Sequence, residues 1–477
     1  LAYYDSWLPP FERLVSQASL VATFSWQYMF EIAGRFVSWP TLLILAIVLA
    51  TYIIVAKRLR VEAIVIITLV ALTVMDNLPQ QSDAQIASAS QHDTIATSVP
   101  DMTKLQNTNS SLDTLFDSHF QNEASRRVRF NPQPATDVPF DLVFLHICSL
   151  SWDDLAALGL SQHPLFARFD ILLTRFNSVA TYSGPAVIRL LRAPCGQPNH
   201  RSLYGQAPEH CYLLPELQRA GFETNLVLNH DGHFDDMLGI IHKQGAQGIE
   251  PMSITGLPIS QRSFDGSPIY NDLAVLNRWA DTVKSGTATR VAAIYNSISL
   301  HDGNKLINSS NWSSSKDTYK TRLENLLNDI DNFITRMEHS NRRIVVALIP
   351  EHGAAFRGDK MQISGMREIP TPTITLVPVG IKVIGPDTNR KGSPVQLDAP
   401  TTYIALSHIL SRMLEHSPFE QTQFSPQDYV IDLPTTRYVA ENADMAMMQN
   451  GDQYYLHMPK TDWRKYVVAP LDKTQRP

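Results

Sequence analysis

The sequence predicts an α/β fold with a mostly parallel sheet flanked by helices, and three observations favour it. From about Pro139 onward, short β-branched runs alternate with amphipathic segments, the pattern of a parallel sheet with helical crossovers. Two of these runs end in Cys148 and in Glu351-His352, at strand ends where α/β sheets bind ligands. Before them, two apolar runs predict an N-terminal membrane anchor of two spans.

Composition narrows the class of protein. The chain has 477 residues, of which 44% are hydrophobic, so it can form a large core. Its net charge of -6 argues against a nucleic-acid partner, because such a protein needs a basic surface. The chain begins at Leu1 and not at Met, which indicates a fragment or a processed product.

The predicted anchor covers residues 37–76. Residues 37–56 supply about twenty mostly apolar positions, enough to cross a bilayer. A basic turn at 57–60 follows, and the second run at 61–75 has about fifteen residues with Glu62 near its start. If both runs span, the positive-inside rule places the turn in the cytoplasm and the large domain outside. If only the first run spans, the same rule leaves the large domain in the cytoplasm.

Three further segments complete the predicted domain organisation. Residues 1–36 contain an amphipathic stretch, which predicts a helix at the membrane interface or the end of a further span. Residues 77–137 are dominated by Ser, Thr, Gln, Asn and Asp, and predict a polar linker with one short helix. Residues 138–477 form the predicted catalytic domain, including a C-terminal hairpin.

The three cysteines give evidence on the cellular compartment of the large domain. Cys195 and Cys211 enclose a short loop rich in Pro, Gly, His and Asn, which predicts a disulfide. Closing about fifteen residues stabilises the fold by roughly 3 kcal/mol in the chain-entropy model. A disulfide indicates an oxidising compartment such as the periplasm, and hence two spans. Cys148 is then the odd thiol, which metal binding would explain. The alternative is that all three are buried free thiols.

The individual elements follow from local patterns. The predicted strands are 140–147, 171–180, 224–228, 291–300, 344–350 and 374–384. Ser151 with Asp154 predicts a capping box at the start of a helix. The helix at 213–219 ends before Gly221, and the helix at 317–338 carries an apolar stripe that predicts core packing. Asn450-Gly451 predicts a type I′ hairpin turn.

Four strand ends should bring reactive side chains to one rim, namely Cys148, His230, His301 and Glu351-His352. Ser183 is predicted to cap a helix there, in Ser183-Gly184-Pro185. A thiolate ligand favours zinc over magnesium or calcium, and three protein ligands would leave a fourth position for the serine oxygen. The alternatives are that Glu351-His352 only starts a helix or turn, and that Ser183 is an ordinary cap worth about 1 kcal/mol.

These motifs resemble the cellulose phosphoethanolamine transferases of bacterial cellulose secretion, in the alkaline phosphatase superfamily, over nearly the whole chain. The matching pattern is Cys148, Thr181-Tyr182-Ser183-Gly184-Pro185, His301-Asp302-Gly303, Pro350-Glu351-His352-Gly353 and Gly365-Met366-Arg367. The resemblance implies an alkaline-phosphatase-like sheet and an inner-membrane enzyme with its catalytic domain in the periplasm. It also implies more membrane helices than this chain contains.

The resemblance further implies a zinc enzyme that takes phosphoethanolamine from phosphatidylethanolamine and passes it to glucose 6-hydroxyls of cellulose. By motif position, Ser183 resembles the nucleophile, which also completes the zinc site. The residues that resemble zinc ligands are Cys148, Glu351 and His352, and those that resemble pocket residues are Tyr182, His301 and Arg367. Related transferases that modify lipid A have threonine and an Asp-His pair at these positions, so serine and Glu-His favour the cellulose branch.

Several roles have structural alternatives. Arg367 would hold phosphoryl oxygens, or it pairs with Glu368 or another carboxylate. His301 would act as general acid and then base, or it caps its turn. His230 and Asp231 would support the site or be plain turn residues. Tyr182 would face the ligand or pack in the core.

Two other functions compete with the transferase. One is another phosphoethanolamine transferase, or a phosphatase, phosphodiesterase or sulfatase, of the same superfamily, although Cys195-Gly196-Gln197-Pro198 misplaces the proline of the sulfatase signature. The other is a non-catalytic subunit that docks on the cellulose synthase complex, and such docking is also expected as a second role of the enzyme.

Overall fold

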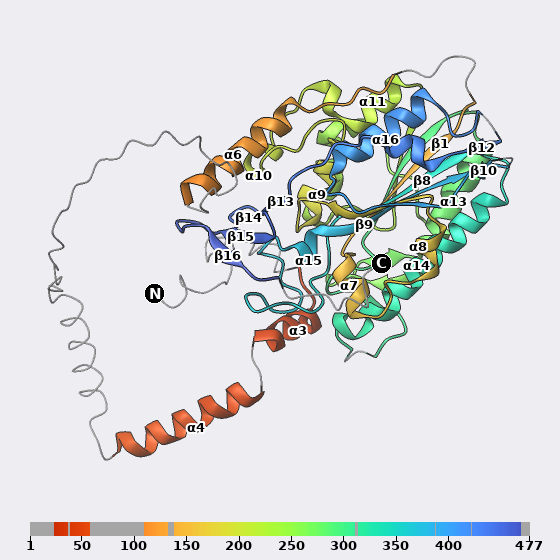
Figure 1. Ribbon diagram of the computed structural model, residues 1–477. Coiled ribbons are helices and arrows are strands. Elements are labelled where there is room, and N and C mark those ends of the chain that lie inside the picture. Colours follow the sequence, from red (N-terminus) through yellow and green to blue (C-terminus); the bar gives the residue numbers. More distant parts are fainter. Residues whose placement is uncertain are drawn as a thin grey trace, which may run out of the picture. The chain divides into compact units, whose positions relative to one another are not determined.

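The structure, a computed structural model, describes residues 23–36, 39–57, 109–131, 138–310, 313–386, 388–420 and 422–468 (Figure 1). The chain divides into two compact units, with boundaries after Ser25 and before Asn107. The larger unit holds the predicted site, and each unit is described by itself.

The smaller unit contains helices α3 (Trp26–Phe36) and α4 (Trp39–Ala56). α4 coincides with the first predicted apolar run, and side chains along it are exposed, among them Leu43 and Ile54. No helix in the described part of the chain is both long enough and apolar enough to cross a membrane. The predicted second span at 61–75 and most of the predicted interfacial segment lie outside the described residues.

A seven-stranded sheet forms the centre of the larger unit, in the order β11-β2-β9-β8-β1-β6-β3. Its strands are β1 (Asp141–Ile147), β2 (Ile171–Asn177), β3 (Glu223–Leu228), β6 (Val291–Ser297), β8 (Ile344–Pro350), β9 (Leu376–Ile384) and β11 (Val395–Leu397). β9 runs antiparallel to β2 and β8, and the other neighbours in the sheet are parallel. The prediction of a mostly parallel sheet is confirmed.

Two predicted strands end earlier than expected. β2 ends at Asn177, whose side-chain oxygen accepts a hydrogen bond from the backbone N–H of Val179 over 2.9 Å. Val179 has a φ of 63°, a left-handed conformation that an extended strand does not contain. β6 ends at Ser297, whose hydroxyl donates to Asp272 over 2.6 Å. β2 thus ends at a local side-chain bond, whereas β6 ends where Ser297 bonds to a residue 25 positions earlier in the chain.

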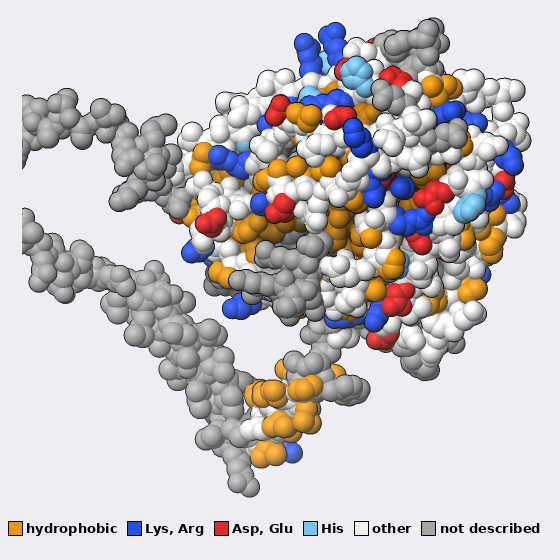
Figure 2. All heavy atoms as spheres, turned by 45° about the vertical axis from the view of Figure 1, so that its right-hand side comes forward, with side chains coloured by type: hydrophobic (Ala, Val, Ile, Leu, Met, Phe, Trp, Pro, Cys, Tyr) orange, Lys and Arg blue, Asp and Glu red, His pale blue; other side chains and the backbone are white. Residues whose placement is uncertain are grey.

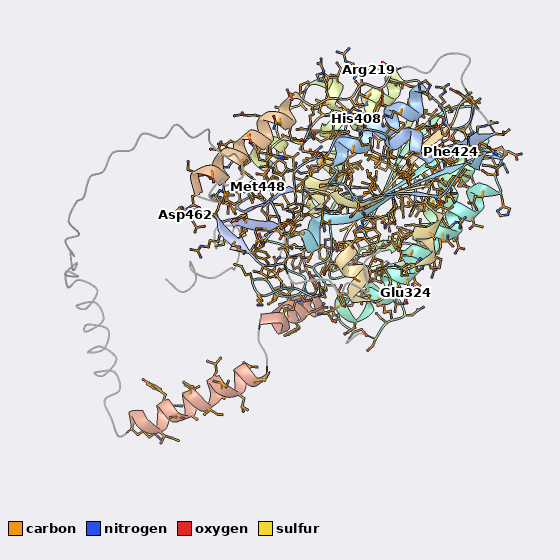
Figure 3. All side chains as sticks on the ribbon, viewed as in Figure 1. Arg219, Glu324, His408, Phe424, Met448 and Asp462 are labelled. Carbon is orange, nitrogen blue, oxygen red and sulfur yellow. A yellow bond between two sulfur atoms is a disulfide. The ribbon has the colours of Figure 1, made fainter. Side chains whose placement is uncertain are left out.

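Helices cover both faces of the sheet (Figure 1). One face packs against α9 (Ser183–Leu191), α11 (Leu213–Arg219), α12 (Met237–Ile241) and α16 (Tyr403–Glu415). The other packs against α7 (Trp152–Ala157), α8 (Pro164–Arg168), α13 (Asp272–Ser285) and α14 (Ser315–Glu338). Arg219 on α11 and Glu324 on α14 mark the two outer sides in Figure 3, where side chains fill the space between them.

Several local signals in the sequence are confirmed. Ser151 and Asp154 form the predicted capping box at the start of α7. α11 has the predicted bounds, and Gly221 follows it with a φ of 92°, a left-handed conformation that glycine adopts readily. The predicted stripe of α14 is buried along its length, namely Tyr319, Leu323, Leu326, Ile330, Phe333 and Met337. These side chains serve the core, as predicted.

A small antiparallel sheet lies near the C-terminus, with strands β13 (Val439–Glu441), β14 (Ala446–Asn450), β15 (Gln453–His457) and β16 (Arg464–Tyr466). The predicted hairpin is confirmed, but its turn is displaced by one residue because Asn450 pairs with Gln453. Of the two turn residues, Gly451 alone has a positive φ. The predicted type I′ geometry is wrong, because it needs a positive φ at both.

Helix α6 (Asn109–Ser125) belongs to the same compact unit as the large sheet. Leu112 is buried among residues of the C-terminal sheet, and Trp463 donates its indole N–H to Asp113 over 2.8 Å. Part of the segment predicted as a polar linker is thus a helix packed on the folded domain.

The predicted disulfide between Cys195 and Cys211 is confirmed.

Short elements complete the described chain. The helical ones are α10 (His200–Leu203), η1 (Glu209–Cys211), η2 (Phe234–Asp236), η3 (His242–Ala246), α15 (Pro372–Thr375) and α17 (Pro426–Val430). The strands are β4 (Ile259–Arg262), β5 (Pro268–Tyr270), β7 (Lys305–Leu306), β10 (Asn389–Arg390) and β12 (Gln423–Phe424). α15 includes the first two residues of the strand predicted at 374–384.

Candidate active site

The site lies at the carboxyl ends of the central parallel strands. Cys148 directly follows β1, and Glu351-His352 directly follows the neighbouring β8. One ligand atom from each of these three residues lies within 4.8 Å of the other two, and all three side chains are buried. The structure therefore brings together the three residues that the sequence selected as metal ligands.

Ser183 lies beside this group, with its Oγ 3.4 Å from Sγ of Cys148. It is the first residue of α9, but it is not the helix cap, so that prediction is wrong by one residue. Tyr182 occupies the cap position, because its backbone is extended and its carbonyl accepts the first helical hydrogen bond, from Ala186. The Ser183 hydroxyl is thus not used as a cap and faces the cysteine.

Two acceptor atoms in the group lack a hydrogen-bond partner among the described residues. Oε2 of Glu351 and Nε2 of His352 lie 3.8 Å apart, both fully buried, and neither has a hydrogen-bond partner among the described residues. Nδ1 of His352 lies 2.9 Å from the Gly353 carbonyl and must donate to it, which leaves Nε2 with its lone pair. Buried polar atoms normally have partners. The sulfur, nitrogen and oxygen set fits a zinc ion, which would satisfy both atoms.

Burial controls the charges of the group. Burial, with the nearby Glu351 acting in the same direction, raises the pKa of the Cys148 thiol to about 12. Burial also lowers the pKa of His352 well below its usual value, with Arg367 acting in the same direction. Without a metal, the thiol is therefore protonated and the imidazole neutral at pH 7.

Arg367 and Tyr182 form one wall of the site. Nη1 of Arg367 donates to Oγ of Ser149 over 3.0 Å, and the guanidinium lies 5.4 Å from the centre of the Tyr182 ring. The Tyr182 hydroxyl donates to Glu368 over 2.6 Å. Nε of Arg367 is buried without a hydrogen-bond partner among the described residues. Ser149 has a φ of 61°, a strained conformation of the kind that gathers at functional sites.

His301 is half-buried, four residues beyond the end of β6. Its Nδ1 donates to the Asp302 carbonyl over 2.7 Å, and its ring packs against Phe234 and Phe264, with ring centres 5.8 and 5.5 Å away. Burial and then Arg367 lower the pKa of His301 to about 4. His301 is therefore neutral at pH 7, with Nε2 able to accept a proton.

The residues after β3 divide into two kinds. His230 is buried, and its Nε2 lies 2.9 Å from the Asn296 side-chain oxygen, so it belongs to the site's support. Asp231 is exposed, and its carboxylate accepts a hydrogen bond from the His233 backbone over 3.1 Å, as in a plain turn. The structure thus gives His230 and Asp231 different roles, which the sequence did not decide.

Asn296 is a site residue that sequence reasoning missed. It lies within β6, and its Nδ2 donates to Oε1 of Glu351 over 2.6 Å. The available signal was one amide in an otherwise largely apolar run, one residue before the end of β6. The signal indicates a site residue only when the strand order is known, because β6 lies beside β1 and Asn296 is in register with His146.

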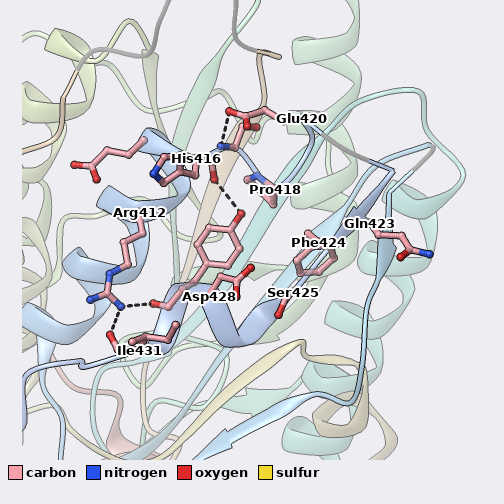
Figure 4. A pocket seen from close by; sticks show the side chains of 12 residues that line it. Arg412, His416, Pro418, Glu420, Gln423, Phe424, Ser425, Asp428 and Ile431 are labelled. Atoms are coloured by element: carbon pink, nitrogen blue, oxygen red, sulfur yellow. Dashed lines mark hydrogen bonds between the residues drawn. The ribbon is translucent and has the colours of Figure 1, made fainter.

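A cavity of about 610 Å³ lies elsewhere, between the end of α16 and α17 (Figure 4). Arg412 donates to the Tyr429 carbonyl over 3.0 Å on one side, and the Tyr429 hydroxyl donates to the His416 carbonyl over 2.9 Å on another. None of the candidate site residues lines it.

On the face seen in Figure 2, Lys and Arg side chains are interspersed with Asp and Glu.

Comparison with known proteins decides the family. Residues 96–463 match the C-terminal domain of the cellulose biosynthesis protein BcsG, and residues 1–74 match its N-terminal domain. The chain belongs to the BcsG family. It is 36% identical to the cellulose biosynthesis protein BcsG of Escherichia coli strain K12 over 485 residues, which is 98% of this chain and 86% of that protein. The BcsG protein of Salmonella typhimurium is also 36% identical, with the same two coverages.

A solved structure supports the fold of this BcsG chain. It is a protein of the alkaline phosphatase superfamily from Vibrio parahaemolyticus, with a TM-score of 0.52 and 14% identity. The alignment covers 74% of this chain and 87% of that one. The expected alkaline-phosphatase-like α/β fold is therefore confirmed, and so is the resemblance to the cellulose branch found in the sequence.

Proposed function

We propose that this BcsG family member is a zinc-dependent phosphoethanolamine transferase of cellulose biosynthesis. Phosphatidylethanolamine would be the donor, and glucose 6-hydroxyls of secreted cellulose the acceptor. The observation that carries the proposal is the position of Ser183 Oγ, 3.4 Å from Cys148 Sγ and beside the open atoms of Glu351 and His352. A hydroxyl at the edge of such a donor set suits nucleophilic attack on phosphorus.

Cys148, Glu351 and His352 would hold the zinc, with Ser183 Oγ in the remaining position. When bound, zinc supplies the positive charge that lowers the pKa of a serine hydroxyl and offsets charge on phosphoryl oxygens. The buried, unpartnered Oε2 of Glu351 and Nε2 of His352 support this assignment. Their enclosure keeps water from competing for the same positions.

Ser183 would act in two displacements. In the first, its oxygen forms a bond to phosphorus while the bond from phosphorus to the diacylglycerol oxygen breaks. In the second, a glucose 6-oxygen forms a bond to phosphorus, the bond to Ser183 breaks, and the serine regains a proton. Ser183 opens α9, so the positive end of the helix dipole would face the phosphoryl group.

Arg367 and His301 would serve the phosphoryl group and the proton respectively. The buried Nε of Arg367 is a donor available to a phosphoryl oxygen, and the contact with Ser149 holds the guanidinium in place. His301 is neutral at pH 7, because burial and Arg367 lower its pKa to about 4, so it can accept the proton of an attacking hydroxyl. It would return that proton to the departing oxygen in each step. Tyr182 would orient Arg367 through the face of its ring.

The proposed location is the bacterial inner membrane, with the catalytic domain in the periplasm and two spans in residues 37–76. The disulfide between Cys195 and Cys211 supports an oxidising compartment. The exposed apolar side chains of α4 support a membrane-bound N-terminal region. Subunits of the cellulose synthase complex would be the protein partners.

The test is intact-mass analysis of the zinc-loaded protein after incubation with phosphatidylethanolamine vesicles. We expect a phosphoethanolamine adduct that peptide mapping places on Ser183, that cello-oligosaccharide removes, and that Ser183→Ala lacks. Ser202→Ala is the matched control on the short helix α10 and should form the adduct.

The rival functions give different results in the same experiment. An adduct that water removes as fast as sugar would indicate a phosphodiesterase. No adduct on fully zinc-loaded protein would contradict the enzyme and favour a docking subunit.

A further inference from the structure

Asn296 fixes one of the two Glu351 oxygens. Its side chain is fully buried, and Nδ2 donates to Glu351 Oε1 over 2.6 Å and to the His146 carbonyl over 3.3 Å. The amide nitrogen has two hydrogens, so it can make both bonds. Oε1 is thereby occupied, and Oε2 is the oxygen left without a partner among the described residues.

The orientation of the Asn296 amide is essential to this arrangement. If the amide were turned over, its oxygen would face Oε1 of Glu351, and two acceptors would lie where a hydrogen bond now forms. A free asparagine amide has no strong preference between the two orientations. The Glu351 carboxylate and the His146 carbonyl both accept, so they favour the orientation observed, and the amide oxygen on the other side then needs a donor.

His230 supplies that donor and reinforces the orientation. Its Nε2 lies 2.9 Å from Oδ1 of Asn296, and an amide oxygen only accepts, so Nε2 carries the hydrogen. Nδ1 then accepts from the backbone N–H of Gly232 over 3.1 Å, which is the arrangement of one neutral tautomer. Burial lowers the pKa of His230, which keeps it neutral. Each donor in the chain from Gly232 to Glu351 faces an acceptor.

We infer that His230 and Asn296 are positioning residues that act through Glu351 and present its Oε2 to the metal. This rests on the proposed function, because it takes Glu351 as a zinc ligand. The relay joins two loops of the sheet edge, after β3 and after β8, through a residue of the strand β6. Partners that orient metal ligands typically change metal affinity by about 10- to 100-fold when lost.

Two substitutions at His230 separate this role from ordinary core packing. The side-chain nitrogen of His230→Gln reaches the position of Nε2 and can still donate to Asn296. His230→Asn is also polar, but its amide reaches only as far as Nδ1, so it keeps the Gly232 contact and loses the Asn296 contact. Both variants remove the imidazole, and both retain a hydrogen-bonding group.

The experiment measures the affinity of the purified full chain for zinc alone, by competition with a chromophoric chelator. We expect His230→Asn to bind zinc about 10- to 100-fold more weakly and His230→Gln to stay close to the wild type. Thermal unfolding of the metal-free proteins accompanies it, to show that each variant is folded. The matched control is the same pair at His242, whose Nε2 lies 3.1 Å from the Ile249 carbonyl, outside the relay.

Three results would overturn the inference. His230→Asn could bind zinc as tightly as the wild type, or His230→Gln could bind it as weakly as His230→Asn. The His242 variants could also weaken zinc to the same degree, which would show a general loss of stability. Each of these leaves the zinc transferase intact if the wild type binds zinc and forms the Ser183 adduct. Wild-type protein that binds no zinc would overturn both.

Discussion

Oε2 of Glu351 and Nε2 of His352 face each other across 3.8 Å, fully buried and without a hydrogen-bond partner among the described residues. Two acceptors in this position repel each other unless a proton or a cation lies between them. The Cys148 sulfur and the Ser183 hydroxyl complete the surroundings at the same sheet edge. This pair is the strongest physical argument for a metal centre in the protein.

Zinc binding should release one proton at pH 7. Burial and Glu351 raise the pKa of Cys148 to about 12, so the metal-free thiol must lose its proton to become a ligand. His352 contributes none, because burial lowers its pKa well below the usual value and it is already neutral. Zinc affinity should therefore rise with pH, by about tenfold per unit between pH 6 and 8.

Isothermal titration calorimetry in buffers of different ionisation enthalpy measures the number of protons released on zinc binding. Cys148→Ala is the matched variant, and it should bind zinc far more weakly. Release of no proton by the wild type would show that the Cys148 thiol is already ionised before binding and would contradict the assigned charges.

Replacing Arg367 should slow the transfer and leave the metal in place. Arg367→Met removes the donors that we assign to the phosphoryl oxygens, and loss of such a group costs about 10²- to 10³-fold in rate. Arg367→Lys should recover only part of the rate, because a lysine keeps the charge but not the planar fork. Single-turnover formation of the Ser183 adduct gives the rates, and metal analysis gives the zinc content.

Arg357→Met is the control for Arg367, since Arg357 pairs with Asp153 at the start of α7. It should form the adduct at the wild-type rate. An unchanged rate in Arg367→Met would remove Arg367 from the proposed mechanism.

Loss of the disulfide should lower stability without removing the site. Cys195 and Cys211 are 16 residues apart, and closing a loop of this length stabilises a fold by about 3 kcal/mol. The double variant Cys195→Ser, Cys211→Ser should therefore lose about that free energy of unfolding in urea titrations. The folded fraction should still bind zinc, because neither sulfur belongs to the ligand set. A stability equal to that of the wild type would show that the disulfide is dispensable.

The ligand residues could be predicted because they stand at strand ends. Cys148 and Glu351-His352 each follow an apolar run, and parallel strands place their carboxyl ends at one edge. Local capping signals were also sufficient for α7 at Ser151. Both kinds of inference need only a short stretch of sequence.

Other features depend on pairing between distant segments, which sequence patterns do not reveal. The role of Asn296 follows from the order β8-β1-β6, and the single reversed strand β9 has the same apolar pattern as its neighbours. The helix cap at Tyr182 was missed because serine is the commoner cap, whereas here its hydroxyl faces Cys148. Ser183 thus departs from the usual preference of serine for the helix-cap position.

The most direct measurement is anomalous diffraction at the zinc absorption edge from crystals of the zinc-loaded catalytic domain. The account predicts one strong peak bonded to Cys148 Sγ, Glu351 Oε2 and His352 Nε2, with the Ser183 oxygen as the fourth neighbour. No peak among these four residues, or a peak that excludes Ser183 from contact, would contradict it.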